Sequence, residues 1–96
     1  MSHTVLIEII CVAGMGPEYV ERLMPLLVDT RAFKGCELVD VYTDEDSPDT
    51  VFLWEKWETR SDQEAYLAWR TETGTLDEMG RYMAVDPRFI HLSSTQ

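Results

Sequence analysis

The segment Thr50–Thr59 (TVFLWEKWET) constrains the fold most, because it carries two tryptophans in a run that is typical of a β-strand. Successive side chains of a strand point to opposite faces of its sheet. Glu55 and Trp57 therefore share one face, whereas Trp54 and Lys56 share the other. A strand with a large aromatic side chain on each face needs cover on both sides. We therefore expect this segment to lie in a sheet that is buried on both faces.

Four strands and two main helices follow from the hydrophobic periodicity and from the turn residues between the elements. The predicted strands cover 4–13, 36–43, 50–59 and 88–92, with a turn at 44–49 between the second and third. The predicted helices begin at Pro17 and at Ser61, where Ser61 and Glu64 form a capping box, and a short further helix follows Gly74. This β-α-β-β-α-β order predicts an α+β protein with the ferredoxin-like split βαβ fold and an antiparallel sheet.

The length of 96 residues predicts one domain over residues 1–96. The formal net charge of −10 argues against nucleic acid and anionic membranes as partners, because both require a basic protein surface. No apolar run is long enough to span a membrane, and the first residues lack the pattern of a signal peptide, so we expect a cytoplasmic protein. The spacing of Cys11 and Cys36 fits neither a disulfide framework nor a metal site, so we expect free thiols and no bound metal.

The second face of the sheet leads to a prediction about assembly. The two main helices of such a fold cover one face only, and Trp54 with the apolar first strand would leave a patch on the other. Soluble monomers rarely expose contiguous apolar patches of more than roughly several hundred Å². We therefore expect a homodimer in which the sheets of two copies meet.

Four segments, in this order and spacing, resemble the antibiotic biosynthesis monooxygenase family, a branch of the dimeric α+β barrel superfamily. They are AGMGPEYVERL after the first strand, KGC at 34–36, the hairpin VYTDEDSPDTVFLWEKWE, and the helix SDQEAYLAW. The resemblance covers nearly the whole chain. It implies a homodimer, and it implies an oxygenase, in many members independent of any cofactor, that acts on quinols, anthrones and similar aromatic molecules. Relatives also include haem-degrading enzymes and an isomerase of a signalling sugar phosphate.

The resemblance also implies a site between the helices and the sheet, at positions matched here by Trp57 and Tyr66. Many members carry an Ala-His pair on the second helix and an S-P-H-F segment soon after it. Here the pair is Ala65-Tyr66, and the later segment TETGTLDEM contains no histidine. A mechanism that depends on that histidine is therefore not expected, which also argues against haem degradation.

An oxygenase without a cofactor needs a flat apolar slot, a base that helps to form the substrate anion, and exclusion of bulk water. Tyr66, Glu55 and His91 are the candidate catalytic residues, with Glu55 or His91 as the base. Substrate-binding candidates are Trp57 and Trp69 as apolar walls and Arg70 as the partner of an oxyanion. The predicted partners are an aromatic small molecule and O2, with no cofactor.

Structural roles compete with each of these assignments. Core or interface packing is the commoner role for tryptophans such as Trp57 and Trp54, and a lone histidine such as His91 is usually structural. Arg70 can be a surface residue paired with Glu64 or Glu72. Two functions follow: a cofactor-independent monooxygenase of quinol- or anthrone-like molecules, or a dimeric module that binds a hydrophobic ligand or partner without catalysis.

Overall fold

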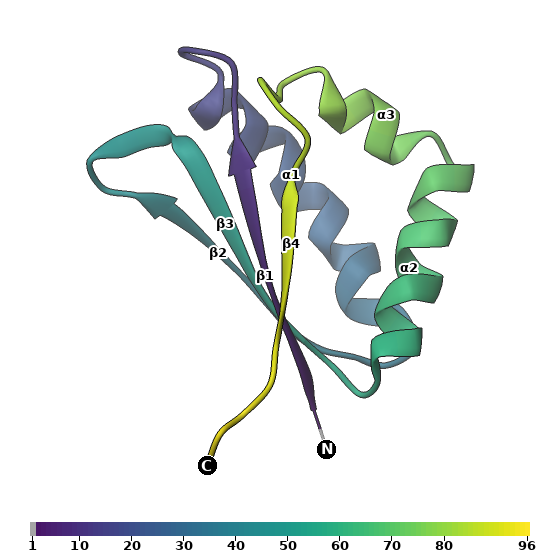
Figure 1. The fold of residues 1–96 in the computed structure, drawn as a ribbon. Coiled ribbons are helices and arrows are strands. Elements are labelled where there is room, and N and C mark those ends of the chain that lie inside the picture. Colours follow the sequence, from purple (N-terminus) through teal and green to yellow (C-terminus); the bar gives the residue numbers. More distant parts are fainter. Residues whose placement is uncertain (1) are drawn as a thin grey trace.

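The computed structural model describes residues 2–96, and its elements follow the predicted order (Figure 1). The strands are β1 (His3–Ile10), β2 (Cys36–Asp44), β3 (Ser47–Trp57) and β4 (Arg88–Leu92), and the helices are α1 (Gly16–Ala32), α2 (Arg60–Glu72) and α3 (Thr75–Gly80). The strands pair in the order β2-β3-β1-β4, and every neighbouring pair is antiparallel. The predicted α+β, ferredoxin-like fold is therefore confirmed.

The three helices lie on one side of the sheet (Figure 1). Alternate residues of the two central strands, among them Val5, Ile9 and Leu53, point to that side and form the core with apolar side chains of α1. Trp57 belongs to this face and is fully buried, whereas Trp54 lies half-buried on the opposite face beside Leu6. The division of the two tryptophans between the faces is as predicted.

The face of the sheet that points away from the helices is apolar at its centre. The register places Leu6 between Trp54 of β3 and Ile90 of β4, and Glu8 between Phe52 and Arg88. The apolar side chains of this face are only half-buried, because no other element of residues 2–96 packs against them; they are Leu6, Phe52, Trp54 and Ile90. A second copy of the chain would bury them, as the sequence predicts.

The loop between β1 and α1 is attached to the start of β3 by one carboxylate. Asp49 accepts hydrogen bonds from the backbone N–H groups of Gly14 (2.9 Å) and Gly16 (2.8 Å). These two bonds lower the pKa of Asp49 below its ordinary value. Gly16 approaches the strand so closely that a Cβ atom there would overlap the Pro48 carbonyl oxygen and lie 2.7 Å from Asp49 Cα.

Substitution of Gly16 by alanine is expected to destabilise the protein by about 2 kcal/mol, because the added methyl group meets backbone that has no rotamer to change. Urea unfolding followed by circular dichroism measures the loss. Gly80→Ala is the matched control, since a Cβ at Gly80 meets no atom within 4 Å. Equal stability of the two variants would contradict the close approach.

The structure corrects several predicted element boundaries, among them the end of the third strand, which lies at Trp57 instead of residue 59. The second helix is capped by Thr59, whose Oγ1 accepts from Asp62 N at 3.1 Å, so the capping box assigned to Ser61 is wrong. The reason is backbone conformation: Thr59 is extended, as a cap requires, and Ser61 already lies within the helix. The first strand ends at Ile10 instead of residue 13, and the third begins at Ser47, because Asp44 pairs with Ser47 across a tight turn.

Candidate active site between the helices and the sheet

A cavity of about 90 Å³ lies between the helix layer and the sheet, and all three helices contribute to its wall. Its lining is mostly leucine, isoleucine and methionine. Polar groups enter it from Tyr19, Thr30, Glu55, Tyr66, Arg70 and Thr75. Within this lining Glu55 is the one carboxylate and Arg70 the one cation. A small number of polar groups in an apolar cavity is the usual composition of a ligand site.

Glu55 is buried in the sheet face that the helices cover, with 3% of its surface exposed. Its Oε1 accepts a hydrogen bond of 2.9 Å from Nε1 of Trp57, which lies two residues further along β3 and therefore on the same face. Burial raises the pKa of Glu55, and the tryptophan N–H opposes this only in part. The carboxyl group is thus held ready to exchange a proton nearer to neutral pH than an exposed glutamate.

The raised pKa of Glu55 predicts how the stability of the protein depends on pH. Between the unfolded-state pKa and the raised folded-state pKa, the folded protein holds the proton more tightly, so stability falls as pH rises. Glu55→Gln removes this ionisation and keeps an acceptor for Trp57. We expect the stability of the variant relative to the parent protein to increase as pH rises from the ordinary glutamate pKa through the raised pKa of Glu55, measured by urea unfolding. A difference that stays constant with pH would contradict the shift.

Arg70 lies on α2 and is also buried, with 4% of its surface exposed. The guanidinium Nε donates to the Tyr66 hydroxyl at 2.8 Å, and Nη2 donates to the Leu26 carbonyl at 2.7 Å and to Thr30 Oγ1 at 3.1 Å. The interpretation of Arg70 as a surface residue paired with Glu64 or Glu72 is therefore wrong. One turn of α2 brings Tyr66 and Arg70 onto the same inward face, and α1 supplies the acceptors.

Tyr66 connects this polar cluster to an aromatic one. Its hydroxyl lies 2.7 Å from Thr30 Oγ1, and its ring centre lies 5.2 Å from that of Trp57. The ring of Phe33 contacts both Tyr66 and Trp57 edge-on, at 5.4 and 6.4 Å. These packed rings fix the position of the tyrosine hydroxyl at the cavity wall.

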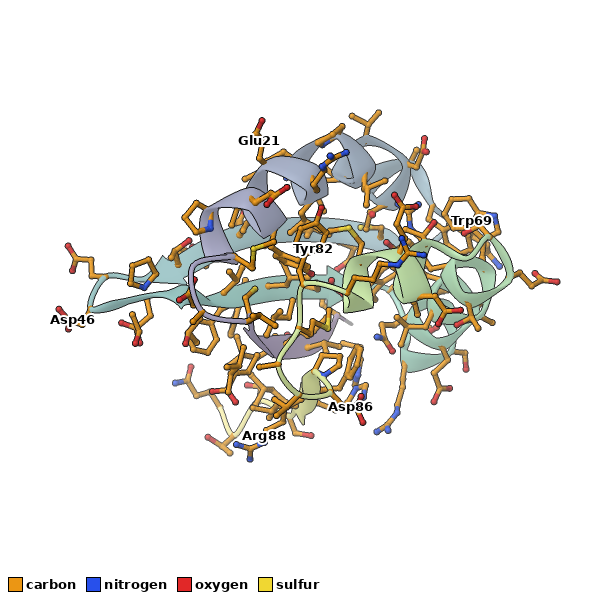
Figure 2. The ribbon with its side chains drawn as sticks, turned by 90° about the horizontal axis from the view of Figure 1, so that it is seen from above. Glu21, Asp46, Trp69, Tyr82, Asp86 and Arg88 are labelled. Atoms are coloured by element: carbon orange, nitrogen blue, oxygen red, sulfur yellow. The ribbon has the colours of Figure 1, made fainter. Side chains whose placement is uncertain are left out.

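The remaining three candidates lie outside the cavity lining. Trp57 is fully buried and donates a hydrogen bond to Glu55. Trp69 packs against the Arg70 guanidinium, and its ring centre lies 4.6 Å from Cζ. Figure 2 shows Trp69 at the edge of the helix layer, at the opposite end of the molecule from Asp46 in the hairpin. His91 pairs with His3 instead, through a hydrogen bond of 2.8 Å between Nδ1 and Nε2. The structure thus brings together Glu55, Tyr66 and Arg70.

Three polar members of the cavity lining were not among the predicted site residues, namely Tyr19, Thr30 and Thr75, and Thr30 is the one that bonds to the predicted residues. It is 1% exposed and bonds to both Tyr66 and Arg70. The available signal was its place in the apolar stripe of α1, one turn after Leu27 and two turns after Leu23. A hydroxyl at such a position needs a buried partner, and that partner comes from another helix.

Other types of site receive no support from the described residues. Among residues 2–96, no group of three or more His, Cys, Asp or Glu side chains is placed to hold a metal ion. Cys11 and Cys36 are free thiols, and burial raises the pKa of each. No helix between residues 2 and 96 combines the length and the apolar character that crossing a membrane requires.

A helix layer on one face of a four-stranded antiparallel sheet, with an apolar cavity between them, defines an α+β domain of the ferredoxin-like class. The sequence model of the family "Antibiotic biosynthesis monooxygenase" matches residues 2–79, and the chain belongs to this family. The matched segment contains Glu55, Tyr66 and Arg70 and ends before β4. Membership supports a monooxygenase-like role.

Solved structures support the same fold. A crystal structure of an antibiotic biosynthesis monooxygenase superposes with a TM-score of 0.86 at 16% identity, covering 100% of both chains. A protein from Deinococcus radiodurans that carries the same family name gives 0.82 at 19% identity, over 100% of this chain and 94% of that one. One from Nitrosomonas europaea gives 0.77 at 18% identity, over 98% and 90%. Among curated proteins, no sequence matches this chain significantly.

Proposed function

We propose that the protein is a cofactor-independent monooxygenase that oxidises a quinol- or anthrone-like aromatic molecule with O2 in this cavity. One observation carries the proposal: a buried carboxyl group, a tyrosine hydroxyl and a guanidinium line the same apolar cavity. The carboxyl group can accept a proton, and the other two groups can hold the negative charge that remains on the substrate. Family membership gives the type of reaction.

The proposed reaction on an anthrone converts a ring methylene into a carbonyl. Ionised Glu55 removes a proton, and Arg70 with Tyr66 stabilises the enolate oxygen. The enolate then gives its electrons to O2, and a carbon–oxygen bond forms. The former methylene carbon of the resulting peroxide then loses its remaining hydrogen as a proton, and the O–O bond breaks. One oxygen atom stays as the carbonyl, and the other leaves as water. The substrate supplies all the electrons.

A fused aromatic substrate needs more room than the cavity offers in this structure, because its 90 Å³ compares with about 300 Å³ or more in typical ligand pockets. A surface hollow of about 430 Å³ adjoins it. Leu76, Met83, Pro87 and Phe89 line both spaces and divide them. Leu76 and Phe89 are 39% and 37% exposed, so they can swing outward and admit a ring system. We propose that the substrate enters here.

The proposal includes a homodimer formed through the open face of the sheet. A second copy would cover Leu6, Trp54 and Ile90, which no helix covers in one chain. Sedimentation at micromolar concentration is expected to give twice the mass of the chain. A monomer at that concentration would contradict this part of the proposal.

Oxygen uptake tests the enzymatic activity. The protein is incubated with a panel of hydroquinones and anthrones, in air and without oxygen, with no added metal or flavin. We expect uptake of one O2 per product with at least one substrate, and a lower rate for Tyr66→Phe. Tyr82→Phe is a matched control, since Tyr82 is not in the cavity lining. Tight binding without oxygen uptake would support a ligand-binding module instead, and recovery of activity only with added flavin or metal would contradict independence from cofactors.

A further inference from the structure

Arg70 is a buried cation whose protein partners are all neutral. Its hydrogen bonds go to the Tyr66 hydroxyl, the Thr30 hydroxyl and the Leu26 carbonyl. The one ion pair among residues 2–96 joins Arg60 and Glu64 on the surface of α2. A buried charge normally has a counter-charge, because its removal from water is costly. Arg70 therefore keeps an uncompensated positive charge at the cavity wall.

The Arg70 guanidinium also has N–H donors that bond to no protein acceptor among residues 2–96. Arginine carries five N–H donors, and the described bonds of Arg70 use Nε and Nη2, which leaves Nη1 without an acceptor in residues 2–96. Nη1 is not enclosed by protein, because the one fully buried side-chain nitrogen or oxygen without a partner among these residues is Nε2 of Gln63. Arg70 lines the cavity, so a ligand bound there would lie beside a guanidinium that still has unused donors.

The only carboxylate in the cavity lining is Glu55, and no ion pair within 4.0 Å joins it to Arg70 in the described chain. The titratable or charged groups that face Glu55 are Tyr19 from α1, Tyr66 and Arg70 from α2, and Cys36 from β2. Burial keeps the phenol of Tyr19 and the thiol of Cys36 neutral by raising the pKa of each. With a proton on Glu55 the cavity has a net charge of +1, and without it the net charge is zero.

We infer that Arg70 is the receptor for an anionic oxygen of the ligand, and that the cavity binds this anion together with one proton, which Glu55 carries. This deepens the proposed function and rests on the same site. An anionic substrate with protonated Glu55 carries the same total charge as a neutral acid with ionised Glu55. The bound anion is therefore the state that follows proton transfer from substrate to Glu55. The substrate class is accordingly an aromatic acid, a phenol or an enolisable aromatic ketone such as an anthrone, whose conjugate base fits beside Arg70.

Benzoate and benzamide test this inference without any need for turnover. They have nearly the same shape, but only benzoate is an anion. Binding is measured without oxygen, by tryptophan fluorescence and by calorimetry in two buffers of different ionisation enthalpy. We expect benzoate to bind at least about tenfold more tightly than benzamide. At pH values above the pKa of Glu55, the difference in binding heat between the two buffers is expected to correspond to uptake of one proton per benzoate. In the same pH range, the logarithm of the association constant for benzoate is expected to fall by about 1 per pH unit.

Two variants separate the roles of the residues. Arg70→Met is expected to abolish the preference for benzoate, whereas Arg22→Met, which removes an exposed cation, keeps it. Glu55→Gln is expected to bind benzoate with no proton uptake and no slope with pH. The comparison of the two ligands in the parent protein needs no variant, so it holds even if Arg70→Met fails to fold.

Equal affinity for both ligands, no binding of either, or proton uptake that persists in Glu55→Gln would overturn the inference. If the protein prefers benzoate and takes up a proton but consumes no oxygen, the inference about Arg70 and Glu55 holds and the proposed oxygenase activity is wrong. If the protein consumes oxygen but binds neutral ligands more tightly than anions, the oxygenase activity holds and the inference is wrong.

Discussion

Substitution of Glu55 by glutamine is expected to lower the rate of oxygen uptake by a factor of about 10²–10⁴, the usual contribution of a general base. Glutamine keeps the shape and the acceptor for Trp57 Nε1, but it cannot take a proton from the substrate. The loss should therefore appear in the rate of anion formation while the fold is unchanged. The measurement is the initial rate of oxygen consumption with an active substrate from the panel.

The pH profile gives the same prediction a second readout. A base works only when ionised, so the rate of the parent protein at subsaturating substrate should rise as pH passes the raised pKa of Glu55. The profile of Glu55→Gln should lack this rise. Glu58→Gln is the matched control, because Glu58 is exposed just beyond the end of β3. Full activity in Glu55→Gln, or an unchanged pH profile, would exclude Glu55 as the base.

Trp57→Ala is expected to destabilise the protein by about 4 kcal/mol, the typical loss when a buried large aromatic side chain is removed. Trp57 is fully buried, and its ring packs against Phe33 and Tyr66. The variant also leaves the buried Glu55 without its hydrogen-bond donor, which adds to the loss. Urea unfolding measures the change, and Trp57→Phe serves if the alanine variant does not fold.

Trp54→Ala is the matched control from the opposite face of the same strand. Trp54 is only half-buried in one chain, so its removal is expected to cost about 1 kcal/mol at low protein concentration. If two copies meet on this face, the loss grows with protein concentration for Trp54→Ala and stays constant for Trp57→Ala. Equal losses at every concentration would contradict the different roles of the two faces.

The order of the elements and the two faces of each strand follow from local sequence patterns. Strand alternation is a property of the backbone, so it places Glu55 on the same face as Trp57 and on the opposite face from Trp54 without any tertiary contact. The same alternation places Leu6 and Trp54 together on the open apolar face of the sheet. Local sequence predicts helix boundaries less accurately. Thr59 and Ser61 are both good N-cap residues, and only the backbone conformation at the end of β3 selects Thr59.

Which polar groups share the cavity depends on how the helices pack on the sheet, and local sequence patterns do not contain this information. An arginine on an amphipathic helix can extend into solvent or turn inward, and Arg70 turns inward because α1 offers the Leu26 carbonyl and the Thr30 hydroxyl. The register pairs His91 with Val5, so His91 lies on the helix-covered face, but it lies near the end of β4 beside His3 and outside the cavity lining. Local patterns fix the direction of a side chain on its own element, whereas its partners depend on how distant elements pack.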